Sequence, residues 1–201
     1  YNLYQIDKEL KDISTLGDRI QPILVDMKDE FSVEQVFKTH EPKLVFHAAA
    51  YKHVHLVESN PNPSILNNIL GTRNLLEAAF KHNCNWFVLV SSDKAVNPVG
   101  VMGATKRVCE LMTTAYGLFS GKHFCSVRFG NVLGSSGSLI PLFQKQIMDG
   151  GPVTVTHKDM KRFFMLINEA VSLVIMAAVI SKPGDINVLK MGEPIKIVDI
   201  A

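Results

Sequence analysis

Short apolar runs and amphipathic segments alternate along the chain. Apolar runs without regular polar interruption predict strands buried on both faces, whereas apolar positions at helical spacing predict helices. The predicted strands span residues 20–25, 43–47, 86–90, 124–129, 153–155 and 186–189. The predicted helices span residues 32–40, 65–80, 103–119, 139–148 and 169–180. Ser32, with Gln35 three residues later, predicts a capping box at the start of the first helix.

This alternation predicts an α/β fold, a Rossmann-like doubly wound parallel sheet covered by helices on both faces. Without repeats or linkers, residues 1–201 are expected to form a single domain, with the substrate-binding part beginning at about residue 130. Ligands of such folds bind beyond the carboxyl ends of the strands. The residues that directly follow the predicted strands are therefore site candidates: Asp26, residues 48–50, residues 91–94, and Gly130 with Asn131.

The chain contains no G-x-G-x-x-G segment, which in a Rossmann fold follows the first strand and cradles the cofactor phosphates. Residues 1–6 begin where the segment after the second strand of such a fold would lie. We therefore interpret the chain as truncated at both ends, without the first βαβ unit and its phosphate cradle.

Composition narrows the class of partner. A formal net charge of +2 with 20% charged residues gives no reason to expect nucleic acid or a membrane surface. The most apolar stretch, residues 170–180, is well short of the roughly 20 residues that a membrane helix needs. The three cysteines contain no C-x-x-C pair, and the histidines form no H-E-x-x-H motif, so we expect no metal. We expect a cytoplasmic homo-oligomer, or the cytoplasmic domain of a membrane-anchored parent.

Several motifs together carry a resemblance to one family. They are H-A-A-A-Y-K-H at residues 47–53, S-S-D-K-A-V-N-P at 91–98, M-G-A-T-K-R at 102–107 and R-F-G-N-V-L-G-S-S-G at 128–137. The chain resembles, over essentially its whole length, the CapD-like nucleotide-sugar 4,6-dehydratases of the extended short-chain dehydrogenases. The resemblance implies an NAD(P)-binding domain with NAD or NADP as cofactor. It also implies a UDP-N-acetylhexosamine substrate, with UDP-N-acetylglucosamine expected, in capsule, O-antigen or glycan synthesis.

Asp93 and Lys94 are the central catalytic candidates, with Ser92 beside them. By chemistry alone, an acid and an amine after a buried strand either divide acid and base roles or form a surface ion pair. The resemblance implies that the Asp93 carboxyl group protonates the leaving 6-hydroxyl while Lys94 removes the carbon-5 proton.

Lys106 stands four residues after Met102, a spacing that puts both side chains on one helix face. The resemblance places Lys106 at the lysine of the Y-x-x-x-K motif, where it would hold the nicotinamide ribose. Met102 replaces the tyrosine, and a thioether cannot exchange a proton. The base for the carbon-4 hydroxyl is therefore open among Ser92, Asp93, Lys94 and a water.

The remaining candidate residues are expected to bind the cofactor or the substrate without taking part in the reaction. Several of them also have a purely structural explanation, which stays open. The alanines could serve tight packing, and Asp26 could be an acid in a turn at a strand end. Asn67 could bridge backbone groups in the helix core, and Arg162 could be a solvated surface charge. The resemblance implies cofactor contacts from Asp26, Ala48, Ala49, Ala50, Asn67, Ser91 and Lys106. It implies substrate contacts from Lys52, His53, Asn131, Ser135, Ser136 and Arg162.

Two rival functions remain. The first is an epimerase of the same fold that acts on a UDP-sugar, although Met102 argues against a 4-epimerase because that chemistry depends on the tyrosine. The second is a catalytically silent cofactor-binding fragment, which the absent phosphate cradle favours.

Overall fold

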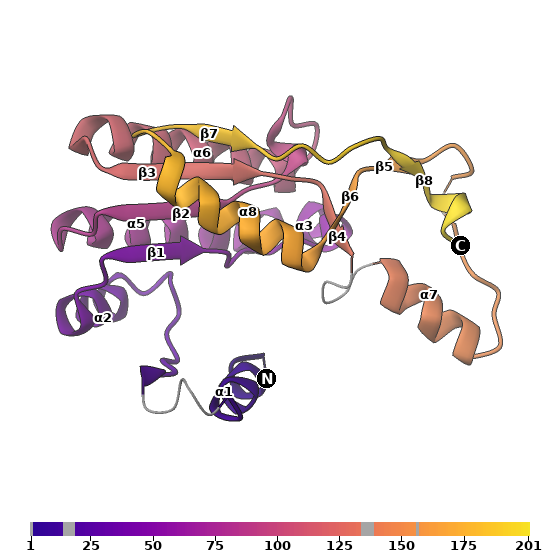
Figure 1. Ribbon diagram of the computed structural model, residues 1–201, viewed down its shortest axis with the longest axis horizontal. Helices are drawn as coiled ribbons and strands as arrows, with labels where there is room; N and C mark the ends of the chain where they lie inside the picture. The colour runs from indigo at the N-terminus through magenta and orange to yellow at the C-terminus, as the bar shows by residue number, and fades with distance from the viewer. Residues whose placement is uncertain (1, 14–18, 134–138, 156) are drawn as a thin grey trace.

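The computed structural model describes residues 2–13, 19–133, 139–155 and 157–201, and its central element is a parallel sheet. The strands β1 (Leu44–His47), β2 (Trp86–Val90), β3 (His123–Arg128) and β7 (Ile186–Val188) pair in the order β1-β2-β3-β7. All three pairings are parallel. The carboxyl ends of the strands therefore meet at one edge of the sheet (Figure 1).

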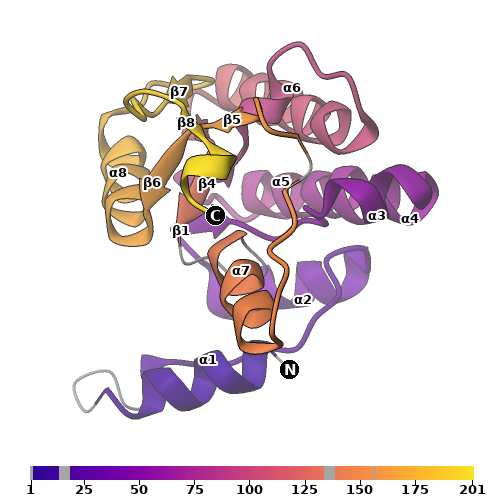
Figure 2. The ribbon, with the colours of Figure 1, turned by 90° about the vertical axis from the view of Figure 1, so that its right-hand side faces the viewer.

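Helices cover both faces of this sheet. On one face lie α5 (Gly71–Lys81) and α6 (Val101–Ser120), and on the other lies α8 (Ile167–Ile180). The three layers separate clearly when the sheet is seen end-on in Figure 2, with α8 on the left and α5 and α6 on the right. The helix α2 (Glu30–His40) packs beside α5. This arrangement confirms the doubly wound α/β prediction.

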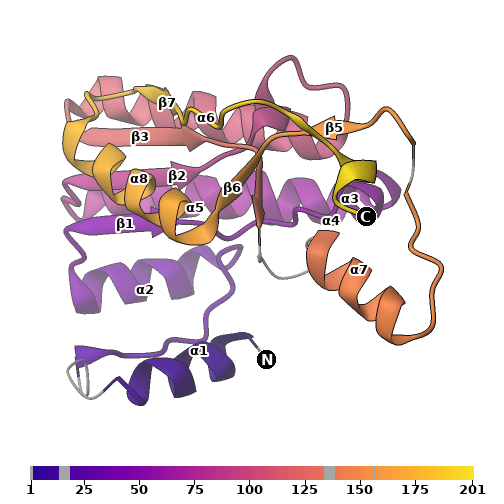
Figure 3. The same ribbon diagram turned by 45° about the vertical axis from the view of Figure 1, so that its right-hand side comes forward.

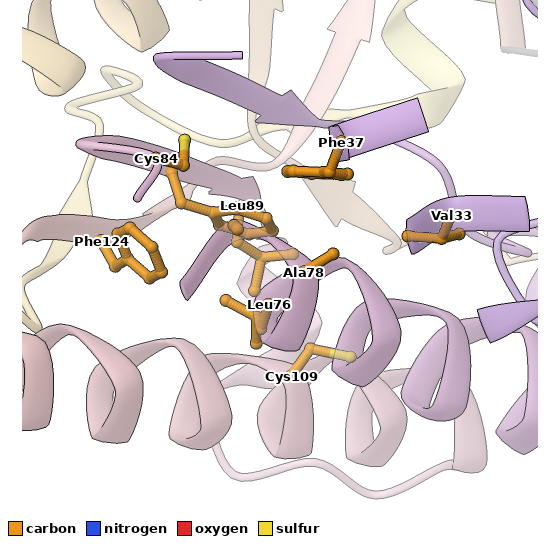
Figure 4. Close-up of a cluster of buried hydrophobic side chains, with 10 residues drawn as sticks. Val33, Phe37, Leu76, Ala78, Cys84, Leu89, Cys109 and Phe124 are labelled. Atoms are coloured by element: carbon orange, nitrogen blue, oxygen red, sulfur yellow. The ribbon is translucent and has the colours of Figure 1, made fainter. Parts of the chain in front are cut away.

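The core lies in two clusters, one on each side of the sheet. Between the sheet, α2, α5 and α6, aromatic and aliphatic side chains such as Phe124, Leu76 and Leu89 are fully buried (Figure 4). Val88 and Val127 point to the other face and pack with α8. Alternate residues of β2 and β3 thus face opposite layers, and this explains why their sequences show apolar runs instead of alternation.

The long predicted helix at 65–80 is interrupted by a wider turn. It consists of α4 (Pro61–Ile65), a π-helix η2 (Leu66–Leu70) and α5, and the short helix α3 (Val54–Ser59) precedes it. Pro61 begins α4 at the first helical position, where its missing N–H costs nothing. π-helical turns within α-helices frequently mark functional positions.

A group of small elements lies beyond the carboxyl ends of the strands (Figure 3). The strand β4 (Asn131–Leu133) pairs in parallel with β6 (Phe164–Leu166), and β5 (Lys161–Arg162) pairs antiparallel with β8 (Ile195–Lys196). The helix α7 (Leu139–Met148) and the 3₁₀ helices η3 (Asp93–Ala95) and η4 (Ile197–Asp199) complete the group. The remaining helix, α1 (Asn2–Lys11), lies at the amino-terminal end of the chain.

Two predicted strands are wrong. Residues 20–25 form no strand, and Leu24 is 89% exposed. A strand needs a neighbour to share its backbone hydrogen bonds. No described strand lies beside residues 20–25, so Ile23 and Val25 instead line a small cavity against α2 and α5.

Residues 153–155 form no strand either, for a different reason. The backbone N–H of Thr154 donates to Oε1 of Gln146 at 3.1 Å, and the Gln146 amide donates to the Thr154 hydroxyl at 2.7 Å. A side chain from α7 thus binds this segment in place of a second strand. The capping box at Ser32 is also wrong, because α2 begins at Glu30 and the Asp29 carboxylate caps it by accepting from the N–H groups of Phe31 and Ser32.

Within the described part of the chain, no helix is long and apolar enough to cross a membrane.

Candidate active site

A cavity of about 900 Å³ opens beyond the carboxyl ends of β1, β2 and β3. It therefore lies where ligands bind in open α/β sheets. Eleven of the predicted site residues line it: Ala48, Ala50, Lys52, His53, Ser91, Ser92, Lys94, Met102, Lys106, Asn131 and Arg162. Ala49, Asn67, Asp93 and Asp26 are not among its lining residues, and Ser135 and Ser136 lie outside the residues that the structure describes.

The Ser92–Lys94 segment forms a compact hydrogen-bonded group at the end of β2. Lys94 Nζ lies 2.9 Å from Asp93 Oδ1, and the Ser92 hydroxyl donates to the same oxygen at 2.9 Å. The backbone N–H of Asp93 donates to the carbonyl of Phe129 at 3.0 Å, which ties the segment to the end of β3. Ser92 and Lys94 line the cavity, and the half-buried carboxylate of Asp93 is bonded to both of them.

The start of α6 packs unusually close to this segment. A Cβ atom on Gly103 would lie 2.2 Å from the carbonyl oxygen of Lys94, so only glycine permits the contact. The neighbouring Met102 is 4% exposed and lines the cavity. Its backbone N–H donates to a carboxylate oxygen of Glu58, from α3, at 3.3 Å.

Lys106 is held in the wall of the cavity. It is 7% exposed, and its Nζ donates to the backbone carbonyl of Val90 at 2.8 Å. Burial lowers the pKa of Lys106, whereas the nearby Cys109 and Glu110 act in the opposite direction. Met102 and Lys106 both line the cavity, as their helical spacing predicted.

Glu110 is the main residue that sequence reasoning missed. It is fully buried and accepts hydrogen bonds from the Ser91 hydroxyl at 2.6 Å, and from Nε and Nη2 of Arg128 at 2.7 and 2.6 Å. Burial would raise the pKa of Glu110, but the bonds from Arg128, Ser91 and Arg107 outweigh it and lower the pKa. One indication of this position is present in the sequence: Glu110 stands four residues after Lys106, a spacing that puts both side chains on the same helix face.

Asn68, not Asn67, holds the loop that follows β1. Its side chain accepts from the backbone N–H of Tyr51 at 2.8 Å, and donates to the Tyr51 carbonyl and to the Thr105 hydroxyl, each at 3.1 Å. Asn67 is half-buried and donates to the Asn68 side chain at 3.1 Å. The buried Asn68 thus links α6 and the 48–53 loop to the π-helix. The sequence could not show which of the two neighbouring asparagines, Asn67 or Asn68, makes these bonds.

His47, the last residue of β1, lies beneath the same loop. Its Nε2 is 2.7 Å from the Thr72 hydroxyl, which itself donates to the carbonyl of Asn68. Because that hydroxyl has only one hydrogen, His47 Nε2 must carry the proton and donate. Burial, with a smaller contribution from the charge of Lys106, lowers the pKa of His47 to about 3, so the ring is neutral.

Comparison with known proteins identifies the family of the chain. The family model described as "Polysaccharide biosynthesis protein" matches residues 1–201. The chain belongs to this family. It is 49% identical over 203 residues to the capsular polysaccharide biosynthesis protein CapD of Staphylococcus aureus, an alignment that covers 100% of the chain and 34% of CapD.

The chain is also similar to two proteins with other names. The chain is 40% identical over 181 residues to a UDP-glucose 4-epimerase of Rickettsia canadensis (strain McKiel), covering 89% of the chain and 52% of the epimerase. The X-ray structure of Pen from Bacillus thuringiensis superposes with a TM-score of 0.91 at 38% identity, covering 100% of the chain and 62% of Pen. The chain thus spans about a third of CapD and about half of the epimerase.

In this family member, basic side chains line the cavity. Lys52 and His53 are exposed on the loop after β1, and Arg162 lies on β5. Arg162 Nη1 donates to the carbonyl of Lys161 at 3.0 Å, while Asn131 reaches the cavity from β4. Cationic groups around a cavity suit an anionic ligand such as a diphosphate.

Asp26 lies away from this group. Its exposed carboxylate accepts from the backbone N–H of Lys28 at 3.0 Å and lies 3.2 Å from Lys28 Nζ. The backbone bond, supported by the lysine charge, lowers the pKa of Asp26. Among the described residues, no group of three or more His, Cys, Asp or Glu side chains is placed to hold a metal ion.

Proposed function

We propose that this protein is an NAD(P)-dependent nucleotide-sugar 4,6-dehydratase that acts on a UDP-N-acetylhexosamine, with UDP-N-acetylglucosamine as the expected substrate. The observation that carries the proposal is the Asp93–Lys94 pair at the edge of a large cavity, with a buried lysine, Lys106, in the wall of the same cavity. An acid, a base and a cofactor-positioning lysine are the groups that this reaction needs.

The residues around Lys106 fit a nicotinamide cofactor. The small side chains of Ala48 and Ala50 allow a dinucleotide to approach the backbone, and Lys106 would hold the nicotinamide ribose. When bound, the cofactor supplies reversible hydride acceptance. The Val90 carbonyl fixes Lys106 Nζ in the cavity wall, and the other N–H groups of this amine would donate to a ribose hydroxyl.

Lys94 and Asp93 would perform the elimination of water. The carbon-5 proton becomes acidic once carbon 4 is a ketone, and Lys94 removes it as the general base. Asp93 donates a proton to the 6-hydroxyl, which leaves as water. The base must be a neutral amine and the acid a protonated carboxyl group. One proton transfer along the 2.9 Å bond from Lys94 Nζ to Asp93 Oδ1 converts the observed ion pair into that state.

After each elimination the pair would return to its charged form, because Lys94 has gained a proton and Asp93 has lost one. Carbon 6 would then take back the hydride, and carbon 5 would take a proton from Lys94, whose amine protons exchange with solvent. The proton released from the carbon-4 hydroxyl on oxidation would restore the acid form of Asp93, which leaves the neutral pair ready for the next cycle. Ser92, which donates to Asp93 Oδ1 at 2.9 Å, would orient the carboxyl group. Met102 lines the cavity but cannot serve as a base, so the carbon-4 proton would go to Asp93, Lys94, Ser92 or a water.

Arg162, Lys52 and Asn131 would bind the UDP part of the substrate. A guanidinium binds phosphate oxygens through two parallel N–H bonds, and its charge persists at every physiological pH. Arg162, on β5, and Lys52, on the loop after β1, line the same cavity.

An epimerase is the second candidate, because the chain is 40% identical to a protein named UDP-glucose 4-epimerase. Met102 argues against an epimerase, because a methionine side chain can neither donate a proton to the carbon-4 hydroxyl nor accept one from it. Mass spectrometry separates the two reactions. A dehydratase turns UDP-N-acetylglucosamine into a product lighter by one water, whereas an epimerase leaves the mass unchanged. The assay uses the natural protein, at whatever length the cell makes it, with NAD and NADP supplied separately.

A further inference from the structure

Glu110 is a buried carboxylate that the proposed chemistry does not use. It is 0% exposed, lies outside the residues that line the cavity, and still accepts four hydrogen bonds. Three come from Ser91 and Arg128, and the fourth comes from Nη1 of Arg107 at 3.1 Å. Burying a charge is costly, and well-packed apolar residues often replace a buried ion pair without loss of stability. The buried ion pair of Glu110 is therefore weak evidence for a role in stability alone.

The partners of Glu110 occupy special places in the sheet. Ser91 directly follows β2, and the residue before it, Val90, accepts the hydrogen bond from Lys106. Arg128 is the last residue of β3. The next residue, Phe129, accepts the backbone hydrogen bond from Asp93. One carboxylate thus binds the carboxyl ends of two adjacent strands.

These strand ends continue directly into the site. The end of β2 leads into Ser92, Asp93 and Lys94, and the end of β3 leads into Asn131. Glu110 itself stands on α6, one turn after Lys106. The carboxylate therefore fixes the distance between the helix that carries Lys106 and the segments that carry the acid, the base and Asn131.

We propose that Glu110 is a positioning residue, which holds the Ser91–Lys94 segment and the end of β3 in register with Lys106. This inference rests on the proposed function. The Glu110 side chain is 0% exposed, whereas that of Asp93 is 36% exposed, so Glu110 acts through Ser91 and Arg128 and not on the substrate. Its loss is expected to slow turnover and to leave substrate binding nearly unchanged.

Glu110→Asp is the most informative variant. It keeps the negative charge for Arg128 but draws the carboxylate back by one methylene group, so it changes position more than charge. A displacement of about 1 Å in an active site can reduce the rate roughly 100-fold. We expect kcat to fall at least about tenfold, with KM changed less than about threefold. Glu110→Gln, which keeps the size and removes the charge, is expected to reduce kcat as well.

The matched control is Glu34→Gln. Glu34 also accepts from two basic side chains, Lys81 at 2.7 Å and His82 at 2.8 Å, but it stands on α2 and does not line the cavity. It is expected to leave kcat unchanged. A general loss of stability would affect both proteins through the folded fraction, so kcat is expressed per folded molecule, measured by circular dichroism at the assay temperature.

If the Glu110 variants do not fold, Ser91→Ala removes one hydrogen bond and leaves the pair of Glu110 with Arg128 intact. It is expected to reduce kcat per folded molecule by about threefold or more, a smaller loss than displacement of the whole carboxylate. Wild-type dehydration together with unchanged kcat in every folded variant among Glu110→Asp, Glu110→Gln and Ser91→Ala would overturn this inference alone. Absence of dehydration by the wild-type protein would overturn the proposed function, and this inference with it.

Discussion

The ammonium group of Lys106 donates to the backbone carbonyl of Val90 at 2.8 Å, and this bond fixes a buried cation at the carboxyl end of β2. Val90 is the last residue of that strand, directly before the Ser91–Lys94 segment. The helix that supplies Lys106 is thus bonded to the same strand end that supplies Asp93 and Lys94. The proposed cofactor and elimination sites share one rigid frame.

Lys106→Met tests the first part of this frame. Methionine fills a similar volume without the charge, so we expect the rate of the first hydride transfer to fall roughly 10²–10³-fold, the usual effect of losing one preorganised electrostatic contact. The absorbance of the reduced cofactor after mixing with UDP-sugar measures it. Lys122→Met is the control, since Lys122 bonds to Asn83 at the exposed surface. Equal hydride-transfer rates in the two variants would rule out the role of Lys106.

Lys94→Ala and Asp93→Asn separate the base from the acid. Lys94→Ala is expected to abolish carbon-5 proton removal while leaving oxidation at carbon 4 partly intact, because the base acts after that oxidation. Asp93→Asn is expected to impair the loss of water. Each loss should be about 10²–10⁴-fold, as for other positioned acids and bases. Quenched-flow mass spectrometry follows each step, and wild-type product formation by both variants would refute the assignment.

Asn68→Ala and Asn67→Ala form a matched pair of neighbouring substitutions. Asn68→Ala leaves the N–H and carbonyl of Tyr51 without their partner and should lower the free energy of unfolding by about 1–3 kcal/mol. Asn67 makes a single bond to its neighbour, so its loss should change stability by about 0.5 kcal/mol or less. Urea unfolding measures both. A larger effect at Asn67 would show that the loop is held differently.

His47 predicts how stability depends on pH. Its pKa is about 3 in the folded protein against 6.5 for a free side chain, so between these values the unfolded state binds more protons. Stability therefore falls as the pH is lowered through that window, by at most about 1.4 kcal/mol per pH unit.

The measurement is urea unfolding at several pH values between 7 and 5. His47→Gln should give a flatter dependence than the wild-type protein over this range. The exposed Gln35→Ala, which changes no titratable group, serves as the control and should keep the wild-type slope. Identical slopes in all three proteins would show that His47 is protonated as easily in the folded state as in the unfolded one.

Much of the fold could be predicted because apolar patterning depends on burial. The strands β2 and β3 have largely apolar sequences since both of their faces are covered, and the predicted parallel pairing of β1, β2 and β3 is confirmed. Residues 20–25 carry the same pattern but form no strand. The apolar pattern shows which residues favour a strand, but a strand forms only where a neighbouring strand shares its backbone hydrogen bonds.

The site was predictable where it depended on strand ends and helix spacing. The Ser92–Lys94 segment and the pair of Met102 and Lys106 do border one cavity. Glu110 was missed because a glutamate on an amphipathic helix ordinarily faces solvent. Its burial depends on Arg128, 18 positions away in the chain, and such long-range pairing leaves no local pattern. The catalytic and binding roles assigned to these residues remain predictions.

The most direct test of the central claim is incubation of UDP-N-acetylglucosamine with the natural protein and its cofactor in deuterated water, followed by mass spectrometry and NMR of the product. A dehydratase gives a 4-keto-6-deoxy sugar nucleotide that has lost one water and carries deuterium from solvent at carbon 5. The wild-type protein should form this product, and the Lys94→Ala variant should not. A product of unchanged composition, inverted at carbon 4 and without deuterium at carbon 5, would contradict the proposed function.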